Sequence, residues 1–448
     1  MFDKLIQEMI ENATKNIIAG VSKEILSSST SFENICSKTQ DTLNTLGINL
    51  IQAICTQIDN IYEENRDRKV YYIKNTKERT ILTSFGNVKL VRRLYRDNKT
   101  KQCFFALDEL LSIPKHTRIE TGLQAKLVEK ATKTSFGEAS RSISNNLSRQ
   151  SIFNIVKNNV NLSQAKQKVE ERKTIKELFI EADEDHIHLN DGKSAEVKLV
   201  YVHEGREEKG DRKELQNAKF FASVGSAEKI WSEVGTYVYT HYDISKCKIH
   251  LSGDGAEWIK NGCKDYFPGA IFHLDKFHVY KSITGACSFS SRSRSKIINA
   301  LKIRDYDALE SAYSNLIRNR LYTKKQMAEN SFSYLDNNFD EITLVGGCPC
   351  SAEGHVSHVL SARMSSRPMG WSKSGAERIA KLRAFLYNKG NFYKIIKKRS
   401  NILKGKEVAK TINSSKKNYK NFYSCYAAVP LLCEKKTPYS DLLRGICS

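Results

Sequence analysis

The stretch Leu178–Leu189, LFIEADEDHIHL, constrains the fold of this chain more than any other segment. Apolar and charged residues alternate in it as they do in a β-strand, in which successive side chains point to opposite faces. A carboxylate in the middle of a strand is costly to bury unless a cation compensates it. One face would carry Phe179, Glu181, Asp183 and Asp185, and the other Ile180, Ala182 and Glu184. We therefore predict a strand whose acidic face binds metal through Asp183.

The segments after this strand predict an α/β sheet. Three strands joined by short turns are followed by a strand, a helix and a further strand, which is the order of a ribonuclease H-like core. In that fold the first strand is central and the fourth pairs with it in parallel. The expected strands are Leu178–Leu189, Ala195–His203, Ala218–Val224, Lys246–Ser252 and Gly269–Leu274, and the expected helices are Ser226–Tyr242 and Ala256–Tyr266.

The fourth expected strand ends in the sequence Ser-Gly-Asp-Gly-Ala, which places Asp254 at its carboxyl end. Asp beside Gly is also common in turns, so a plain turn is the alternative interpretation. Sites in α/β sheets gather at the carboxyl ends of strands, and the preceding segment is apolar. We therefore expect Asp254 to lie beside Asp183.

Two glutamates are candidates for a third acid. Glu377 stands three residues after Ser374, the spacing of a helix capping box, which would explain Glu377 without catalysis. Glu353 has no such partner and shares a helical stripe with Val356, Leu360 and Arg363. The stripe would point Glu353 toward the sheet, so we choose it over Glu377.

Three carboxylates on separate elements form a set that suits divalent cations. Mg²⁺ prefers oxygen ligands and is usually bound by one or two carboxylates together with substrate phosphate. Two such ions about 4 Å apart can activate the attacking oxygen and stabilise the leaving oxygen of a phosphodiester. We expect two Mg²⁺ ions, with Mn²⁺ as a substitute, on Asp183, Asp254 and Glu353. Asp185 and Glu184 remain possible accessory ligands.

The residues before the sheet predict an α-helical N-terminal region, a small β element and a helix-turn-helix. Phe85-Gly86-Asn87 has the character of a turn between two strands. In SFGEASRSISNNLSRQSIFNIVKN a second helix begins near Ser148 and carries Arg149, Gln150 and Ser151 at its front. Residues at that position of a recognition helix can reach base edges in the major groove. A plain three-helix bundle is the alternative.

The chain is expected to divide into six segments. A helical insertion would separate the fifth strand from the glutamate helix, and a tail rich in Lys, Arg and aromatic residues would follow. The segments are residues 1–69 (helical), 70–176 (β-hairpin and helix-turn-helix), 177–284 (first part of the core), 285–344 (helical insertion), 345–390 (last part of the core) and 391–448 (basic tail).

Composition indicates a polyanionic partner. The 448 residues contain 72 Lys and Arg against 50 Asp and Glu, a net charge of +22. The basic residues cluster, so DNA or RNA is favoured over a merely solvated basic surface. The eleven cysteines are scattered, and no signal peptide or apolar stretch of membrane-spanning length is found. These features predict a reduced, cytoplasmic protein.

Four stretches resemble a known family. They are FIEADEDHIHL, SGDGAEWI, FHLDKFHVYK and SAEGHVSHVLSARMSSRPMGW. Together they resemble the DDE insertion-sequence transposases of the ISLre type, an otherwise uncharacterised family within the Mutator-like superfamily. The resemblance covers nearly the whole chain. It implies a ribonuclease H-like fold with a helical insertion before the last acid, and a metal-binding triad of Asp183, Asp254 and Glu353.

The resemblance further implies Mg²⁺-dependent nicking of element ends and joining of the 3′-hydroxyls to target DNA. It places Asp275 and His278 where related transposases have a Cys-x-x-His pair, with Asp replacing the Cys. His278, Arg363 and Arg367 are added as candidate DNA contacts. A homodimer or larger synaptic assembly and association with the nucleoid are expected by analogy. The alternatives are a ribonuclease H-like nuclease or resolvase without strand transfer, and a catalytically dead DNA-binding derivative.

Overall fold

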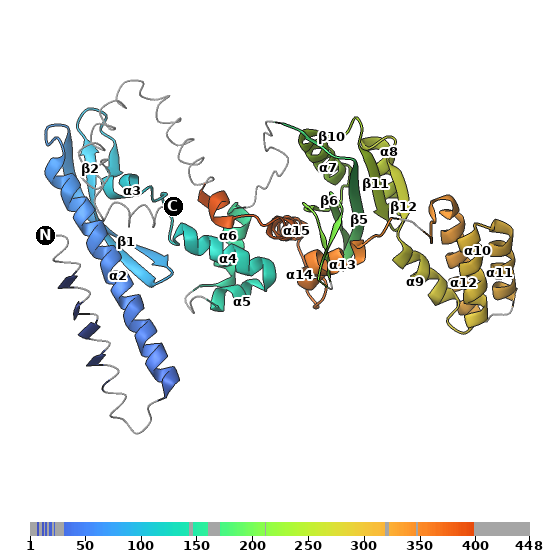
Figure 1. Ribbon diagram of the computed structural model, residues 1–448. Coiled ribbons are helices and arrows are strands. Elements are labelled where there is room, and N and C mark those ends of the chain that lie inside the picture. The colour runs from blue at the N-terminus through green and yellow to red at the C-terminus, as the bar shows by residue number, and fades with distance from the viewer. Residues whose placement is uncertain are drawn as a thin grey trace. The chain divides into compact units, whose positions relative to one another are not determined.

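Figure 1 shows the computed structural model of the chain. The structure describes residues 31–142, 147–159, 171–210, 212–318, 322–345 and 348–397, together with isolated positions before residue 31. Residues 145 and 146, which lie between the two helices of the expected helix-turn-helix, and the part of the expected basic tail after residue 397 lie outside these ranges. Two compact units are present, residues 1–127 with 392–448, and residues 128–391.

The first unit contains a long helix and a small sheet. Helix α2 (Phe32–Asn65) begins after Ser31, whose hydroxyl accepts a hydrogen bond from the Asn34 amide. Strands β1 (Tyr71–Thr83), β2 (Gly86–Asp97) and β3 (Cys103–Phe105) form an antiparallel sheet, and the short helix α3 (Ala106–Leu110) follows. Gly86 has a φ of +131°, as the tight turn between β1 and β2 requires. The predicted hairpin turn is confirmed.

Three helices precede the main sheet: α4 (Thr121–Lys133), α5 (Phe136–Arg141) and α6 (Arg149–Asn159). Ser148 accepts a hydrogen bond from the Ser151 amide, so α6 begins where the sequence predicted a recognition helix. The hairpin and these last two helices fall in different units, although the sequence placed them in one segment.

Two buried arginines bind the last turn of α4. Arg363 donates from Nε to the Ala131 carbonyl at 3.2 Å, and Arg383 donates to the Thr132 carbonyl at 3.2 Å. Both carbonyls lie in the last turn of α4, where they have no partner within the helix. The C-terminus of α4 is therefore held by side chains of the second unit.

The second unit is a mixed α/β structure around a five-stranded sheet of order β12-β11-β5-β6-β9. Strands β6 and β9 continue antiparallel from β5, while β11 and β12 run parallel to it. The five strands expected from the sequence are all present, and the first is central. Their bounds are β5 (Glu177–His188), β6 (Ser194–His203), β9 (Lys219–Val224), β11 (Lys248–Gly253) and β12 (Ile271–Leu274).

Short strands accompany the sheet. Strands β7 (Arg206–Lys209) and β8 (Arg212–Leu215) form a charged hairpin between β6 and β9, and β4 (Lys173–Thr174) pairs with β10 (Tyr242–Asp243).

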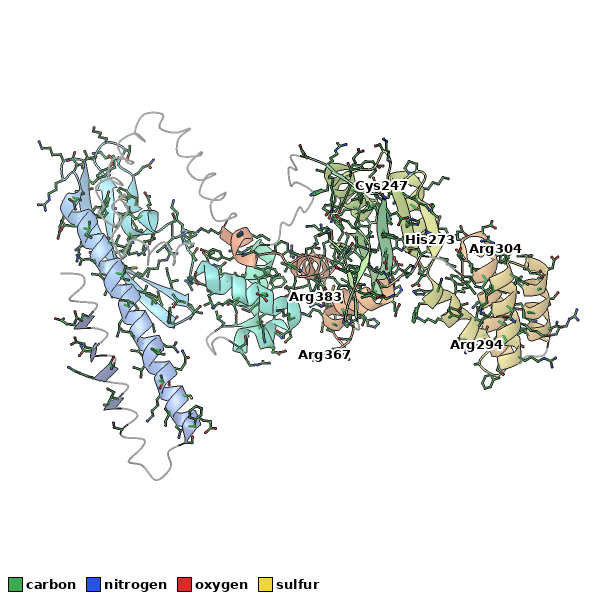
Figure 2. The ribbon with its side chains drawn as sticks, in the orientation of Figure 1. Cys247, His273, Arg294, Arg304, Arg367 and Arg383 are labelled. Carbon is green, nitrogen blue, oxygen red and sulfur yellow. The ribbon has the colours of Figure 1, made fainter. Side chains whose placement is uncertain are left out.

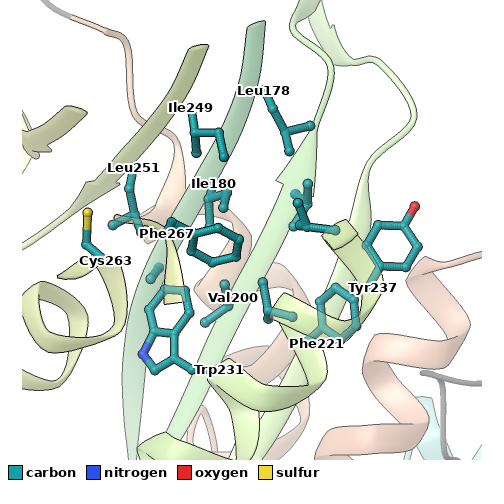
Figure 3. Close-up of a cluster of buried hydrophobic side chains, with 14 of the residues drawn as sticks. Leu178, Ile180, Val200, Phe221, Trp231, Tyr237, Ile249, Leu251, Cys263 and Phe267 are labelled. Atoms are coloured by element: carbon teal, nitrogen blue, oxygen red, sulfur yellow. The ribbon is translucent and has the colours of Figure 1, made fainter. Parts of the chain in front are cut away.

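The hydrophobic core lies on one face of the sheet. Helices α7 (Ala227–His241) and α8 (Glu257–Tyr266) cover this face. Ile180 and Ala182 from β5 pack there with Leu251 and Trp231, all essentially inaccessible to solvent (Figure 3). Because side chains alternate along β5, burying these residues turns Glu181 and Asp183 to the opposite face. The assignment of faces made from the sequence is confirmed.

A bundle of helices follows β12, where the sequence predicted an insertion. Helix α9 (Lys276–Ala286) leads into α10 (Ser291–Ile303), α11 (Tyr306–Arg318), α12 (Tyr322–Asp336) and the short η1 (Phe339–Glu341) (Figure 1). One buried cluster joins Leu274 of β12 and Ile283 of α9 to Tyr313 of α11. The bundle is thus anchored to the edge of the sheet.

The chain then returns to the acidic face of the sheet. Helix α13 (Ala352–Val356) runs through a π-helical turn, η2 (Ser357–Ser361), into α14 (Ala362–Met364), and α15 (Lys373–Tyr387) completes the unit. π-turns within α-helices are rare and occur often at functional sites. No helix among the described residues is both long and apolar enough to cross a membrane.

Gly262 of α8 offers a direct test of this core. A Cβ at this position would lie 2.0 Å from Trp231 Cε2, although the backbone has no positive φ. We expect Gly262→Ala to lower the free energy of unfolding by about 1–3 kcal/mol, since overpacking outweighs the better helix propensity of Ala. Urea denaturation measures the change.

Gly285 in α9 is the matched control, because the nearest atom to an added Cβ is Met327 Cε at 3.7 Å. Gly285→Ala should leave stability unchanged or raise it by about 0.5–1 kcal/mol. Equal effects of the two substitutions would contradict the packing described here.

Candidate metal centre

Asp183 and Asp254 come together because β5 and β11 are parallel neighbours. Ser252 pairs with Glu181 in the register, so two further residues along each strand bring Asp254 level with Asp183. The strands approach closely here, since a Cβ on Gly253 would lie 3.0 Å from the Ala182 carbonyl. Asp254 is half-buried, and its Oδ1 also accepts a hydrogen bond from the Ala256 amide at 2.9 Å. The turn and the paired position are therefore both present.

Asp183 is buried, with 5% of the residue exposed. Its Oδ1 accepts a hydrogen bond from the Glu184 amide at 2.8 Å. Its Oδ2 is buried and has no hydrogen-bond partner. An unsatisfied carboxylate oxygen inside a protein costs free energy unless a cation or another donor reaches it. Asp183 therefore has an oxygen available to a ligand.

Glu353 lies close to Asp183, although it comes from helix α13. It lies in the first turn of α13 with 47% of its side chain exposed, and Ser351 before it makes no side-chain cap. One atom each of Asp183, His278 and Glu353 lie within 4.8 Å of one another. Asp183 and Glu353 thus converge with a histidine between them, whereas Asp254, the other acid singled out from the sequence, is not part of this group of ligand atoms.

His278 sits in the first turn of α9. Its Nε2 lies 3.9 Å from Asp183 Oδ2 and 3.7 Å from Glu353 Oε2. Burial alone would lower the pKa of His278, but the neighbouring carboxylate of Asp183 and the charges of Asp254 and Asp275 outweigh burial and raise this pKa. The imidazolium form partly offsets the repulsion among the carboxylates.

Asp275, expected from the resemblance to replace a cysteine, has a structural role. Its side chain accepts a hydrogen bond from the Phe277 amide at 3.0 Å and caps the N-terminus of α9. A capping aspartate fixes the first turn of its helix. It therefore orients the turn that carries His278.

Glu181, two residues before Asp183 on the same face, differs sharply from it. Only 2% of Glu181 is exposed, but both its oxygens are satisfied. Oε1 accepts from His203 Nε2 at 3.0 Å and Arg206 Nη2 at 2.7 Å. Oε2 accepts from the Tyr201 hydroxyl and from the amide and hydroxyl of Ser351. Sequence reasoning placed Glu181 on the acidic face but gave no sign of these partners, which come from distant elements.

The neighbouring acids considered as accessory ligands have other partners. Asp185 accepts a hydrogen bond from the Ser365 hydroxyl at 2.8 Å. Glu184 points to the opposite face, where it lies 3.5 Å from the buried Lys198. Neither belongs to the group of ligand atoms around Asp183.

Glu377 is also a structural acid, but not for the reason predicted. Helix α15 is capped by Ser372, whose hydroxyl accepts from the Gly375 amide, so the expected capping box from Ser374 is wrong. Glu377 accepts instead from the Val224 amide at 2.6 Å and pairs with Lys229 at 2.6 Å. It ties α15 to the end of β9, a tertiary contact that has no local sequence pattern.

The candidate DNA contacts divide into exposed and buried residues. Arg149 and Gln150 are exposed at the front of α6, and Ser151 beside them is half-buried. Arg367 is exposed in the turn after α14 (Figure 2). Arg363 is 6% exposed and is occupied with the Ala131 carbonyl, so its guanidinium is not free for DNA, and that prediction is corrected. Burial and the charge of Arg383 lower the pKa of Arg363 to about 10.

Comparison with known proteins gives the family. The model of UPF0236, described as an uncharacterised protein family, matches residues 25–399. The chain belongs to UPF0236. This match includes the sheet, the helical bundle and every residue of the candidate site.

UPF0236 proteins with similar sequences occur in two bacteria. Two from Caldanaerobacter subterraneus subsp. tengcongensis are each 33% identical over 404 residues, which is 88% of this chain and 86% of theirs. The "UPF0236 protein in vanSb 3′region" of Streptococcus gallolyticus is 27% identical over 328 residues, 68% of this chain and 72% of its own. The similarity therefore spans both units.

We expect substitutions of Glu377 and Glu353 to differ in their effect on stability. Glu377→Gln should lower the free energy of unfolding by about 1–3 kcal/mol, because the Val224 amide and Lys229 lose their charged acceptor. Glu353→Gln should change it by less than about 0.5 kcal/mol, since Glu353 is half-exposed and accepts no short hydrogen bond. Chemical denaturation of both variants decides, and a larger loss for Glu353→Gln would contradict the assignment.

Proposed function

We propose that this UPF0236 protein is a DNA transposase that nicks the ends of its element and joins the 3′-hydroxyls to target DNA. The observation that carries the proposal is the convergence of Asp183 from β5 and Glu353 from α13 onto one spot, with Asp254 at the end of the neighbouring strand β11. Such a set of acids on a chain of net charge +22 suits metal-dependent chemistry on a nucleic-acid phosphodiester.

The finer fold assignment is part of the proposal. Three antiparallel strands, two further strands parallel to the first, and a helical bundle before the glutamate helix are what a ribonuclease H-like core with an insertion requires. The strand order puts the first and fourth strands side by side, as the proposed acid pair demands. Fold by itself does not specify function, so the site has to carry the argument.

The residues present fit a divalent cation. Asp183 Oδ2 is a buried oxygen without a hydrogen-bond partner, and Glu353 faces it across His278. Asp254, at the end of the neighbouring strand β11, would add a further carboxylate. Such a set of oxygens suits Mg²⁺ and also Mn²⁺. When bound there, a pair of such ions supplies Lewis acidity to the attacking and leaving oxygens of the phosphodiester.

The chain's own residues would hold and orient the reacting groups. Asp183 and Asp254 fix the cation side of the site from two adjacent strands, and Glu353 closes it from α13. His278, held by the α9 turn, is placed to donate a hydrogen bond to a phosphate oxygen. Helices α13 and η2 pack against β5, the strand that carries Asp183.

The names of the relatives are consistent with a mobile element. One protein of Caldanaerobacter subterraneus carries a name that joins eleven locus designations, and another joins four. A gene that moves and copies itself leaves the same product at several loci. A cytoplasmic, nucleoid-associated location and a dimer or larger synaptic assembly go with this proposal.

The central test is cleavage of DNA carrying the ends that flank this reading frame. Asp183→Asn, Asp254→Asn and Glu353→Gln should each reduce Mg²⁺-dependent nicking more than about a hundredfold, because loss of a metal ligand costs more than loss of its supporting partner. Glu377→Gln should keep its activity below its melting temperature. Activity that survives Glu353→Gln and vanishes in Glu377→Gln would reverse the choice of third acid.

Strand transfer separates the transposase from a nuclease or resolvase. A DNA end with a pre-cut 3′-hydroxyl should be joined to a target plasmid in the presence of Mg²⁺ or Mn²⁺. Hydrolysis without any joined product would favour the nuclease. Specific DNA binding without cleavage, unchanged by Asp183→Ala, would favour a DNA-binding derivative.

The N-terminal residues of α6 are proposed to recognise the DNA sequence of the element ends. Arg149→Ala and Gln150→Ala should each reduce discrimination between the element end and random DNA by about 1–3 kcal/mol, as expected for lost base-edge contacts. Competition binding at fixed salt measures this ratio. Arg367→Ala should instead weaken binding to both DNAs alike, since a phosphate contact carries no sequence information. A uniform loss in the α6 variants would argue against base recognition.

A further inference from the structure

Glu181 joins the two elements that carry two of the proposed metal ligands. It lies two residues before Asp183 on β5, and it accepts a hydrogen bond from the amide of Ser351, two residues before Glu353, at 2.6 Å. Ser351 is also the N-cap residue of α13. One carboxylate therefore fixes the distance between the strand of the first acid and the helix of the third.

Arg206 provides a second link between Glu181 and the segment before α13. Its Nη2 lies 2.7 Å from Glu181 Oε1, and it also donates to the Pro349 carbonyl at 2.8 Å and to the Ser351 hydroxyl at 3.2 Å. The segment before α13 is thus held through a backbone amide at Ser351 and a backbone carbonyl at Pro349. Side chains that bond to backbone groups at two nearby positions fix the direction of a segment as well as its place.

The rest of the surroundings keeps Glu181 ionised and rigid. Burial would raise the pKa of Glu181, but the hydrogen bonds from His203, Tyr201 and Ser351 together with the charge of Arg206 hold it well below its usual range. His355, one turn after the start of α13, packs on the Tyr201 ring at 4.7 Å and bonds to the Ser351 carbonyl at 3.0 Å. A buried network with all members satisfied is rigid.

Glu181 itself is not available as a ligand, since five hydrogen bonds occupy its two oxygens. Its role must be exercised through other residues. Partners that orient metal ligands from behind typically change metal affinity or activity by about 10- to 100-fold when they are removed.

We propose that Glu181, with Arg206, is a positioning residue that sets Glu353 against Asp183 and so determines the affinity of the site for divalent cations. This inference rests on the proposed function. It assigns a role to a buried acid of the β5 face that the metal site does not use.

The test measures Mn²⁺ binding to the full chain directly. Electron paramagnetic resonance detects the free Mn²⁺ and so gives the dissociation constant. Glu181→Gln keeps the size of the side chain but removes its charge and leaves an acceptor oxygen on only one side. We expect its Mn²⁺ dissociation constant to rise about tenfold. Cleavage by this variant should be restored in large part by raising the Mn²⁺ concentration, because the ligands themselves remain.

Glu377→Gln is the matched control. Glu377 also accepts a backbone amide and pairs with a cation, but at β9 and α7, away from α13. It should lose stability and keep wild-type Mn²⁺ affinity. Glu181→Gln with wild-type affinity would overturn the positioning role and leave only a structural one.

Arg206→Met decides the matter if Glu181→Gln does not fold. Arg206 is partly exposed, and Glu181 keeps its bonds to His203, Tyr201 and Ser351 without it. The Mn²⁺ dissociation constant of Arg206→Met should rise severalfold. In the double variant with Glu181→Gln, the fold-increase should be smaller than the product of the two single fold-increases, since both substitutions break the same connection. An unchanged affinity would overturn the proposal.

Asp183→Asn separates this inference from the proposed function. If the wild type binds Mn²⁺ and Asp183→Asn does not, the site exists, and Glu181→Gln tests positioning alone. If the two proteins bind Mn²⁺ equally weakly, the metal site and the proposed function fail together with the inference.

Discussion

A carboxylate inside a protein must find donors or a cation, and this constraint organises the acidic face of the sheet. Glu181 and Asp183 are two residues apart on one strand and equally removed from water. Glu181 is satisfied by four residues from β6, the β7 strand and the segment before α13. Asp183 keeps a buried oxygen with no hydrogen-bond partner. Glu181 therefore stabilises the fold, whereas Asp183 has an oxygen that a ligand can reach.

The same division runs through the other acids of this unit. Glu377 accepts a hydrogen bond from a backbone amide and pairs with a lysine. Asp275 caps a helix, and Asp185 accepts a hydrogen bond from a serine hydroxyl. Glu353 is half-exposed, has only His278 near its carboxylate among the ion pairs of the described residues, and lies in a helix followed by a π-turn. The number of hydrogen-bond and ion-pair partners that each acid has within the protein separates acids with a structural role from those open to a ligand more clearly than their positions along the chain do.

Buried arginines have a comparable organising role. Arg363 and Arg383 donate to carbonyls in the last turn of α4 and so bind the helices before the sheet to those after it. Arg363 was expected to meet DNA because it is basic and close in sequence to the third acid. A guanidinium that is committed to an otherwise unpaired helix terminus is not free to bind phosphate. A basic residue that is close in sequence to a candidate site can therefore belong to the scaffold of the protein.

The sequence by itself determined the five strands, the central place of β5 and the face on which Asp183 lies, because strand alternation and apolar runs are local signals. It also gave Asp254 and Glu353 as candidates. Only the tertiary structure decided that Glu181 is fully bonded, that Glu377 accepts a hydrogen bond from the Val224 amide, and that His278 stands between Asp183 and Glu353. These features depend on partners up to 170 positions away. No pattern of neighbouring residues encodes such contacts, which arise only when separate elements pack against one sheet.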